Sequence, residues 1–514
     1  MSCLTCSNCG FVNSLSPEPQ LQALNSSDTL ILQILRGSRP LLESDHAQIN
    51  DEIAKLERLG SWYNARLQET QLHWHTILKS MEKRKSIYAP IRRLPRDILI
   101  EIFHSVCDSW RLDAEEDTTE RDSLDMTGPL WVLGSVCGLW RDILRTSPAS
   151  WARYVLVKSP SFKHAREILQ AYLEHTGEHP LSLVAVCHSL NLAEDGEIMS
   201  LLVQSSYRWK NVCIRAHTHH MHHLESVSHF PVLQTIEIDI FDDDDSFLDM
   251  SSDMCLKAPQ LWQAILPSQG INQVRLPSGI THYSGYITCV EDIQLLSQLP
   301  KLRMCHLQSS LVSLTDAAPV VMAELRQLYV EDSDTLDFLT APMLQSLTIV
   351  DVPPGSLLSG IILFFRRSGC RLESLSMCTD IPSALISNIF SSEACSMISH
   401  LKLELGPDWD DISKILAPSS ILPNLRHLVL CFESRYSHHR ETERLAFLDM
   451  IRSRCKARLL IEIQFGWGVS TAHDIEADIR AIIGDNSEMR VGKWSQLNLD
   501  YRYSFSGPRL PELW

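Results

Sequence analysis

The hydrophobic pattern of this chain first indicates helices. Residues 1–44 combine a flexible, cysteine-containing tail with a short helix over roughly 21–35. Residues 45–87 then carry a seven-residue repeat in which eight of ten seam positions are apolar. Such a repeat predicts a long amphipathic helix, either a coiled-coil seam or one arm of a helical hairpin, and a helix packed on its own domain is the alternative. We expect Asp45 to be its N-cap, with Gln48 completing a capping box.

A compact block follows over residues 88–156. Apolar residues at helical spacing run from Leu94 to Val106, a second apolar helix is expected over 130–144, and Ser147–Pro148 ends it. The acidic segment 111–127 between them is expected to be a solvated loop. Two or three short helices cannot bury this much apolar surface alone, so the stripe is either an interface or packs on the downstream domain.

The residues of this block resemble the F-box motif. Residues 90–103 read PIRRLPRDILIEIF, and residues 130–151 read LWVLGSVCGLWRDILRTSPASW. The resemblance implies a three-helix module that binds a Skp-type adaptor and, through it, a cullin. Its matching positions imply that the adaptor contacts are Leu94, Pro95, Ile98, Leu99, Ile102, Phe103, Val136, Cys137 and Trp140.

Two features of this resemblance leave alternatives open. Trp140 could equally belong to the internal core of the module. The acidic insertion is longer than a compact F-box needs, so it either projects away or crowds the adaptor. The whole arrangement, with a helix before the motif and irregular repeats after it, is similar to that of fungal F-box proteins.

Residues 157–514 repeat the pattern apolar-x-x-apolar-x-apolar, with units that begin 19 to 38 residues apart. Most of these spacings fall in the range of leucine-rich repeats, in which each unit supplies one strand and one helix or turn. No unit carries the Asn that closes the usual repeat, so the repeats are degenerate, and the two longest spacings predict inserted loops. A non-repeating α/β domain is the alternative. The units begin at Trp209, Leu233, Ile271, Leu302, Leu325, Leu344, Leu372, Ile398 and Leu425.

Alternation along each predicted strand places one residue of every unit on the outer face of the sheet. This row has mixed charge and few aromatic residues, and it does not identify a ligand. The expected target-binding residues are Glu237, Arg275, His306, Tyr329, Thr348, Ser376, Lys402 and, less polar than these, Val429.

Charge and composition narrow the function classes. The 514 residues carry a formal net charge of −17, which disfavours a nucleic-acid partner. No apolar run reaches the length of a membrane span, and no secretory signal is apparent. The 15 cysteines are odd in number and scattered, which favours free thiols in the cytoplasm or nucleus.

Candidate chemistry is sparse. Cys3, Cys6 and Cys9 form two Cys-x-x-Cys steps, and residues 6–10 resemble one zinc knuckle, but no second cysteine pair follows nearby; free thiols without metal are expected there, and a structural zinc site is the alternative. The histidines between 217 and 223 and the acidic run 242–245 are expected to be solvated loops. Catalytic motifs are absent, so neither an enzyme nor a cofactor is expected.

The expected fold class is α plus α/β: an N-terminal helix or coiled coil, a three-helix F-box, and a leucine-rich-repeat-like α/β solenoid. The function that this organisation predicts is substrate recognition for a Skp–cullin–F-box ubiquitin ligase. The alternative is a non-ligase scaffold protein that assembles through residues 45–85.

Overall fold

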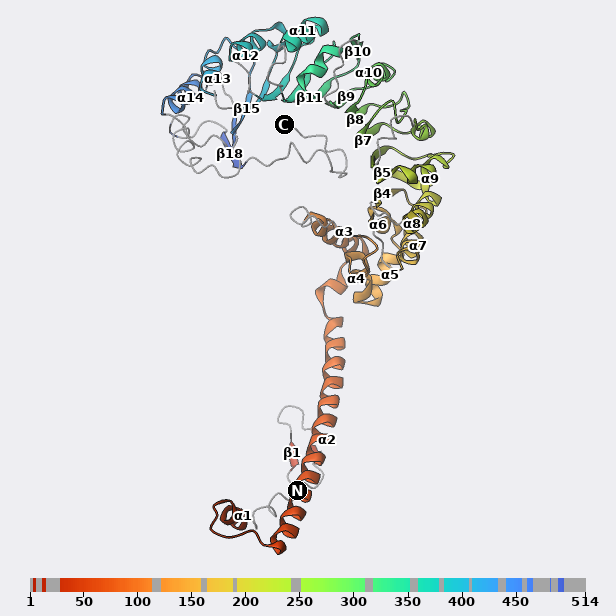
Figure 1. Cartoon of the computed structure of the whole chain (residues 1–514), viewed down its shortest axis with the longest axis vertical. Helices are drawn as coiled ribbons and strands as arrows, with labels where there is room; N and C mark the ends of the chain where they lie inside the picture. Colours follow the sequence, from red (N-terminus) through yellow and green to blue (C-terminus); the bar gives the residue numbers. More distant parts are fainter. Residues whose placement is uncertain are drawn as a thin grey trace. The chain divides into compact units, whose positions relative to one another are not determined.

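The structure is a computed structural model of an α/β protein, shown in Figure 1. It divides into two compact units, Met1–Leu99 and Ile100–Trp514. The division falls inside one helix, whereas the sequence predicts boundaries near residues 88 and 156. The structure describes residues 3–5, 12–14, 28–112, 122–158, 164–187, 192–241, 251–309, 318–351, 359–378, 383–405, 409–432, 441–454, 460–465, 481 and 489–493.

A single long helix dominates the first unit. This helix, α2, covers Glu43–Ile87, which confirms the long helix predicted from the seven-residue repeat. A short antiparallel pair, β1 (Cys3–Thr5) with β2 (Val12–Ser14), and the helix α1 (Asp28–Leu35) precede it.

The start of α2 differs from the expectation. Leu42 is the N-cap, and Asp45 lies at the third helical position. Its carboxylate accepts the backbone N–H of Leu42 at 3.2 Å and lies 3.0 Å from the guanidinium of Arg39. Asp45 therefore makes the capping-box hydrogen bond from the third helical residue back to the N-cap. Its carboxylate satisfies the backbone N–H of the N-cap residue, which has no partner within the helix.

Short helices fill the block that follows. The single helix expected over 130–144 is two helices, because Cys137 between them has an extended backbone with φ −160° and ψ 167°. Gly138 then begins the next helix. The elements are η2 (Pro90–Arg93), α3 (Arg96–Leu112), α4 (Pro129–Val136), α5 (Gly138–Arg145) and α6 (Pro148–Ala152).

The second unit is built on one 14-stranded sheet, in which every adjacent pair of strands is parallel and the strands follow sequence order. Such an order requires each connection to return over the same side. Its strands are β3 (Val155–Lys158), β4 (Leu181–Cys187), β5 (Trp209–His217), β6 (Thr235–Phe241), β7 (Gln263–Gly270), β8 (His282–Ile287), β9 (Met304–Ser309), β11 (Gln327–Asp332), β13 (Ser346–Asp351), β14 (Ser374–Cys378), β15 (His400–Leu405), β16 (His427–Phe432), β17 (Leu460–Phe465) and β18 (Met489–Lys493).

The connections carry helices, which lie along one side of the sheet in Figure 1. A separate two-stranded sheet joins β10 (Val320–Val321) and β12 (Leu339–Thr340). The α-helices are α7 (Ala165–Thr176), α8 (Leu192–Gln204), α9 (Met221–Glu225), α10 (Val290–Leu296), α11 (Ser359–Ser368), α12 (Ser383–Phe390), α13 (Trp409–Leu416) and α14 (Glu441–Arg454). Shorter 3-10 turns are η4 (Ser206–Arg208), η5 (Thr218–His220), η7 (Met254–Lys257), η8 (Ser333–Phe338) and η9 (Glu393–Cys395).

Eight of the nine predicted repeat units coincide with strands, and the unit at Ile271 does not. Two true units occupy that interval, beginning at Leu261 and Ile280, so the long spacings around it are not inserted loops. The second was hidden because Tyr283 and Gly285 take its inward positions. A Cβ at Gly285 would collide with the phenol of Tyr283, so this strand can accept the large ring only beside a glycine.

The core of the sheet is a continuous ladder of buried side chains. The parallel registers join Leu328 to Leu347 and Leu347 to Leu375 on successive strands, and all three are buried. The same row runs from Val155 on β3 to Ile461 on β17. Each side chain therefore packs between neighbours from the units before and after it.

Replacing Leu347 by Ala tests this ladder. Leu347 is 0% exposed, so the variant leaves a cavity that its neighbours on two strands cannot fill, and we expect a loss of about 2–5 kcal/mol in unfolding free energy. Leu363→Ala on α11 is the matched control, since Leu363 is 46% exposed, and we expect a change within about 0.5 kcal/mol. Urea unfolding followed by circular dichroism measures both, and equal losses would contradict the ladder.

Candidate partner-binding surfaces

Helix α3 carries two apolar stripes, of which one is buried and the other is exposed. Leu99 and Phe103, four residues apart, are 1% and 0% exposed. Both were expected at the adaptor surface, but they belong to the core of the chain. The reason is that residues at i and i+4 share one helical face, and this face is the one turned inward.

The neighbouring stripe of α3 faces outward. Ile98 and Val106 are 44% and 42% exposed, Ile102 between them is half-buried, and Leu94 and Pro95 before the helix are also exposed. Of the positions expected in the first half of the motif, these retain side-chain surface for a partner. Val106 had no place in the expected set, although its spacing of four from Ile102 indicates it.

The second half of the motif divides in the same way. Val136 is exposed at the end of α4 and Cys137 is half-buried in the break after it. Trp140 is half-buried, and its ring centroid lies 5.0 Å from that of the buried Phe103. This contact favours the core alternative for Trp140. Val132 and Leu139, which were not expected at the surface, are exposed.

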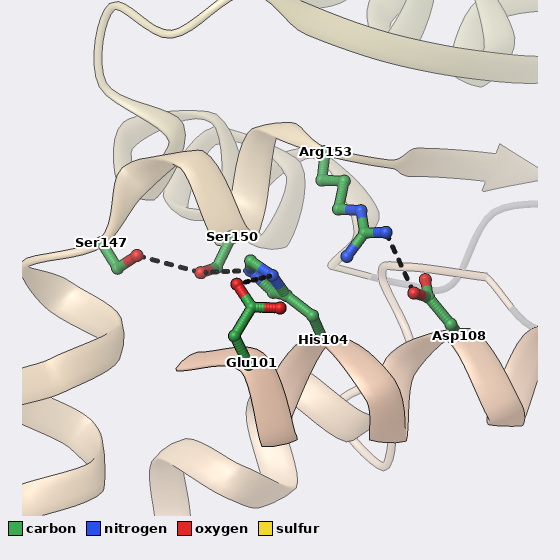
Figure 2. Close-up of polar contacts among 6 residues, drawn as sticks. All are labelled: Glu101, His104, Asp108, Ser147, Ser150 and Arg153. Atoms are coloured by element: carbon green, nitrogen blue, oxygen red, sulfur yellow. Dashed lines mark hydrogen bonds and ion pairs between the residues drawn. The ribbon is translucent and has the colours of Figure 1, made fainter. Parts of the chain in front are cut away.

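Polar contacts connect α3 to the N-terminal part of α6, as Figure 2 shows. His104 Nε2 lies 3.0 Å from Ser150 Oγ, which in turn lies 3.0 Å from Ser147 Oγ. The carboxylate of Glu101 lies 4.0 Å from the other ring nitrogen of His104. Burial is the largest cause that lowers the pKa of His104, so a neutral imidazole is the form that this network holds near neutral pH.

An ion pair extends the same polar face. The guanidinium of Arg153 lies 3.0 Å from the carboxylate of Asp108, and Figure 2 shows this pair further along α3. His104 and Asp108 therefore use one side of α3 for contacts with other residues of the chain. The apolar stripe of Ile98, Ile102 and Val106 is thus a separate face of α3.

The acidic segment is not wholly a solvated loop. Residues 113–121 lie outside the described residues, but Ser123 pairs with β3: its N–H donates to Leu156 O at 2.8 Å, and its Oγ accepts the N–H of Leu156 at 2.9 Å. Leu124 is buried. Because β3 is an edge strand of the sheet, these bonds satisfy backbone groups that would otherwise be unpaired along that edge.

Asp122 anchors this segment at a buried site. Its carboxylate accepts the N–H of Leu124 at 2.8 Å and that of Lys158 at 3.3 Å. Burial outweighs these bonds and raises the pKa of Asp122 to about 6. The sequence offered no signal for this, since Asp122 is one of several acidic residues in the run.

An aromatic cluster connects the helical block to the repeat region. The ring of Trp151 on α6 lies 5.2 Å from that of Trp131, 5.1 Å from Tyr172 and 4.7 Å from His175, centroid to centroid. The indole N–H of Trp151 donates to Leu144 O at 3.2 Å. The helices α4 and α6 and the helix α7 therefore share one core, so residues on both sides of position 156 belong to the same compact unit.

The sheet register places most residues of the predicted outer row side by side on adjacent strands. Register joins His306, Tyr329, Thr348, Ser376 and Lys402 on five adjacent strands, and each is half-buried. The rings of His306 and Tyr329 lie 4.1 Å apart. Val429 continues the row but is buried.

Two expected members do not lie on the exposed row: one is buried, and the other lies outside the strands. Glu237 is in register but only 2% exposed, and its carboxylate lies 3.2 Å from the guanidinium of Arg215. Burial raises the pKa of Glu237, although Arg215 opposes this. Arg275 lies after β7, off the strands, with its guanidinium 3.4 Å from Asp253. Its place in the row is taken by Ile265, because the true repeat unit begins ten residues earlier.

A second row, two residues before the first, was missed. Its polar members include His282, Ser346, His400 and His427, which are half-buried, and Gln327, which is exposed. The rings of His400 and His427 lie 5.8 Å apart. The two-residue period of a strand would have found this row, since residues i and i−2 share a face.

The candidate metal ligands lie only partly within the described residues. Among the residues that the structure describes, no group of three His, Cys, Asp or Glu side chains could hold a metal ion. Cys6, Cys9 and 242–245 lie outside those residues. The histidine run is partly packed, not a solvated loop: His220 is buried, and burial, with the neighbouring histidines, lowers its pKa to about 4.

Comparison with models of known families found no match for this chain, and none of the curated proteins matches it. Within the described residues, no helix is long and apolar enough to cross a membrane. The ten cysteines whose surroundings are described are free thiols.

The buried carboxylate of Asp122 predicts a pH dependence of stability. Because its pKa rises from 3.8 to about 6 on folding, the folded state binds its proton more tightly, and stability falls as pH rises from about 4 through 6. Asp122→Asn removes this pH dependence but also one of the two acceptor oxygens, so we expect the stability of the variant relative to the unaltered protein to rise by up to about 3 kcal/mol between pH 4 and 7. Urea unfolding at pH 4 and 7 measures the difference, and a pH-independent difference would contradict the assignment.

Proposed function

We propose that this chain is the substrate-recognition subunit of a Skp–cullin–F-box type ubiquitin ligase. One observation carries the proposal: the stripe of Ile98, Ile102 and Val106 remains on the surface of α3, while the adjacent stripe of the same helix is buried. These exposed positions fall within or directly after the stretch that resembles an F-box.

Energetics support a partner at this stripe. Covering a fully exposed Ile or Leu side chain contributes about 1.5–3 kcal/mol, so several half-exposed apolar side chains supply a usable docking energy. Val132, Val136 and Leu139 add exposed apolar side chains on α4 and α5. The partner proposed for them is a Skp-type adaptor, through which the chain would reach a cullin.

The proposed finer fold of the second unit is a leucine-rich-repeat-like solenoid. Strand order equal to sequence order, parallel pairing and a buried apolar ladder on one face of the sheet support it. In this proposal the row from His306 to Lys402 binds a target protein. The ligase then acts by holding the target near the ubiquitin donor, and no catalysis by this chain is needed. Buried, free thiols agree with a cytoplasmic or nuclear location.

Ile98→Asp tests the adaptor surface. A carboxylate at this position cannot be buried without a large desolvation cost, so we expect binding to a Skp-type adaptor to weaken at least about 100-fold. Co-expression followed by gel filtration and calorimetry measures it. Leu363→Asp is the matched control, because Leu363 is a similarly exposed apolar residue on α11, and it should bind as the unaltered protein does.

Two outcomes would contradict the adaptor proposal. One is failure of the unaltered chain to co-elute with any Skp-type adaptor. The other is equal binding by Ile98→Asp and Leu363→Asp, which would place the interface on another face.

The target surface predicts a separate effect. Tyr329→Ala with Lys402→Glu changes the proposed row without touching α3, so we expect adaptor binding to be retained and target capture to be lost. Proximity labelling with and without proteasome inhibition measures this, scored on proteins that accumulate under inhibition only when Ile98 is intact. Continued labelling of those proteins by the double variant would exclude this row as the target surface.

A further inference from the structure

Helix α2 exposes its heptad seam. Asp45 is the one buried residue among its 45, so the described chain does not cover the apolar side chains that repeat along it. Among the described residues of Met1–Leu99, none packs over this seam as the alternative of a helix buried on its own domain requires. The exposed seam residues are Ile53, Leu56, Leu67, Trp74, Ile77 and Met81, and Ile49 and Tyr63 are half-buried.

We propose that two copies of this chain associate through α2 as an antiparallel coiled coil. In heptad terms Ile53 is an a position and Leu56 a d position, and the seam runs from His46 to Arg84. Those 39 residues make up more than five heptads, and a coiled coil needs three to four. They span roughly 58 Å at 1.5 Å per residue. The inference does not depend on ligase function.

Antiparallel packing pairs each a position with a d position of the other copy. Centring the pair at residue 65 places Ile53 opposite Ile77 and Leu56 opposite Trp74, with Gly60 opposite Thr70 in the next layer. A Cβ at Gly60 would meet no atom of the described residues, so its small size serves no contact among them. In the pair it gives room beside the Trp74 ring.

Parallel packing is poorer because each layer then joins identical residues. Gly60 would meet Gly60 and leave a gap, while Trp74 would meet Trp74 in a layer that is overfilled. Glu52 would also face Glu57 of the other copy across the seam at flanking g and e positions, which is a like-charge pair. The antiparallel register has neither the stacked tryptophans nor this repulsion.

The charges of α2 also favour opposite directions. Residues 43–57 hold five carboxylates and one lysine, whereas residues 79–85 hold four cations and one carboxylate. Antiparallel copies bring unlike ends together, and they place Glu43 opposite Lys85 at flanking e positions. At the centre Arg66 meets Arg66, but each already pairs with Glu69 of its own helix at 2.6 Å.

Association is tested on the full chain by light scattering and sedimentation at micromolar concentration. We expect twice the chain mass of 58.4 kDa. Leu56→Asp should yield the monomer, because it puts a charge into the seam. Leu72→Asp is the matched control: Leu72 lies on the opposite face of α2 and is 66% exposed, so the dimer should persist. Circular dichroism checks that both variants keep their helix.

Direction is tested by charge reversal. Glu43→Lys and Lys85→Glu should each weaken dimerisation roughly tenfold, since each turns two unlike pairs into like ones, and the two together should restore it. In a parallel pair neither residue faces the other, so single reversals without effect would overturn the antiparallel assignment. A monomeric unaltered chain, or equal masses for Leu56→Asp and Leu72→Asp, would overturn association through this seam.

Discussion

The second unit depends on one interaction, the packing of a buried side chain against its register partners on the strands before and after it. The row that passes through Leu328, Leu347 and Leu375 is buried from one edge of the sheet to near the other. Each unit contributes too little apolar surface to be stable alone. Neighbouring units therefore stabilise one another, and the strands follow sequence order because each new unit can pack only on the exposed face of the last.

The ends of such a stack need protection, and the helical block supplies it at β3. Ser123 exchanges two hydrogen bonds with Leu156 at the edge strand, and Trp151 packs on the first repeat helix through Tyr172 and His175. The block that resembles an F-box is thereby continuous with the sheet.

Apolar surface that remains exposed separates the proposed binding faces of this chain from its core. On α3 the residues one position apart, Ile98 and Leu99, differ from 44% to 1% exposed. On α2 the seam is uncovered along most of its length. Both surfaces are stripes at helical spacing, and each is suited to another helix or bundle as its partner.

The sequence by itself determined a long helix over 45–87, the alternation of strands and helices after residue 156 and most members of the outer row, because all of these follow from side-chain period. It could not place the unit at Leu261, whose apolar signal is weakened by Ala264, nor the one at Ile280, where Gly285 yields space to Tyr283. Only the tertiary structure decided which stripe of α3 is buried. It also decided that the carboxylates of Asp122 and Glu237 are buried, the latter beside the guanidinium of Arg215. Periodicity tells which residues share a face, but what covers that face is set by contacts between segments far apart in the chain.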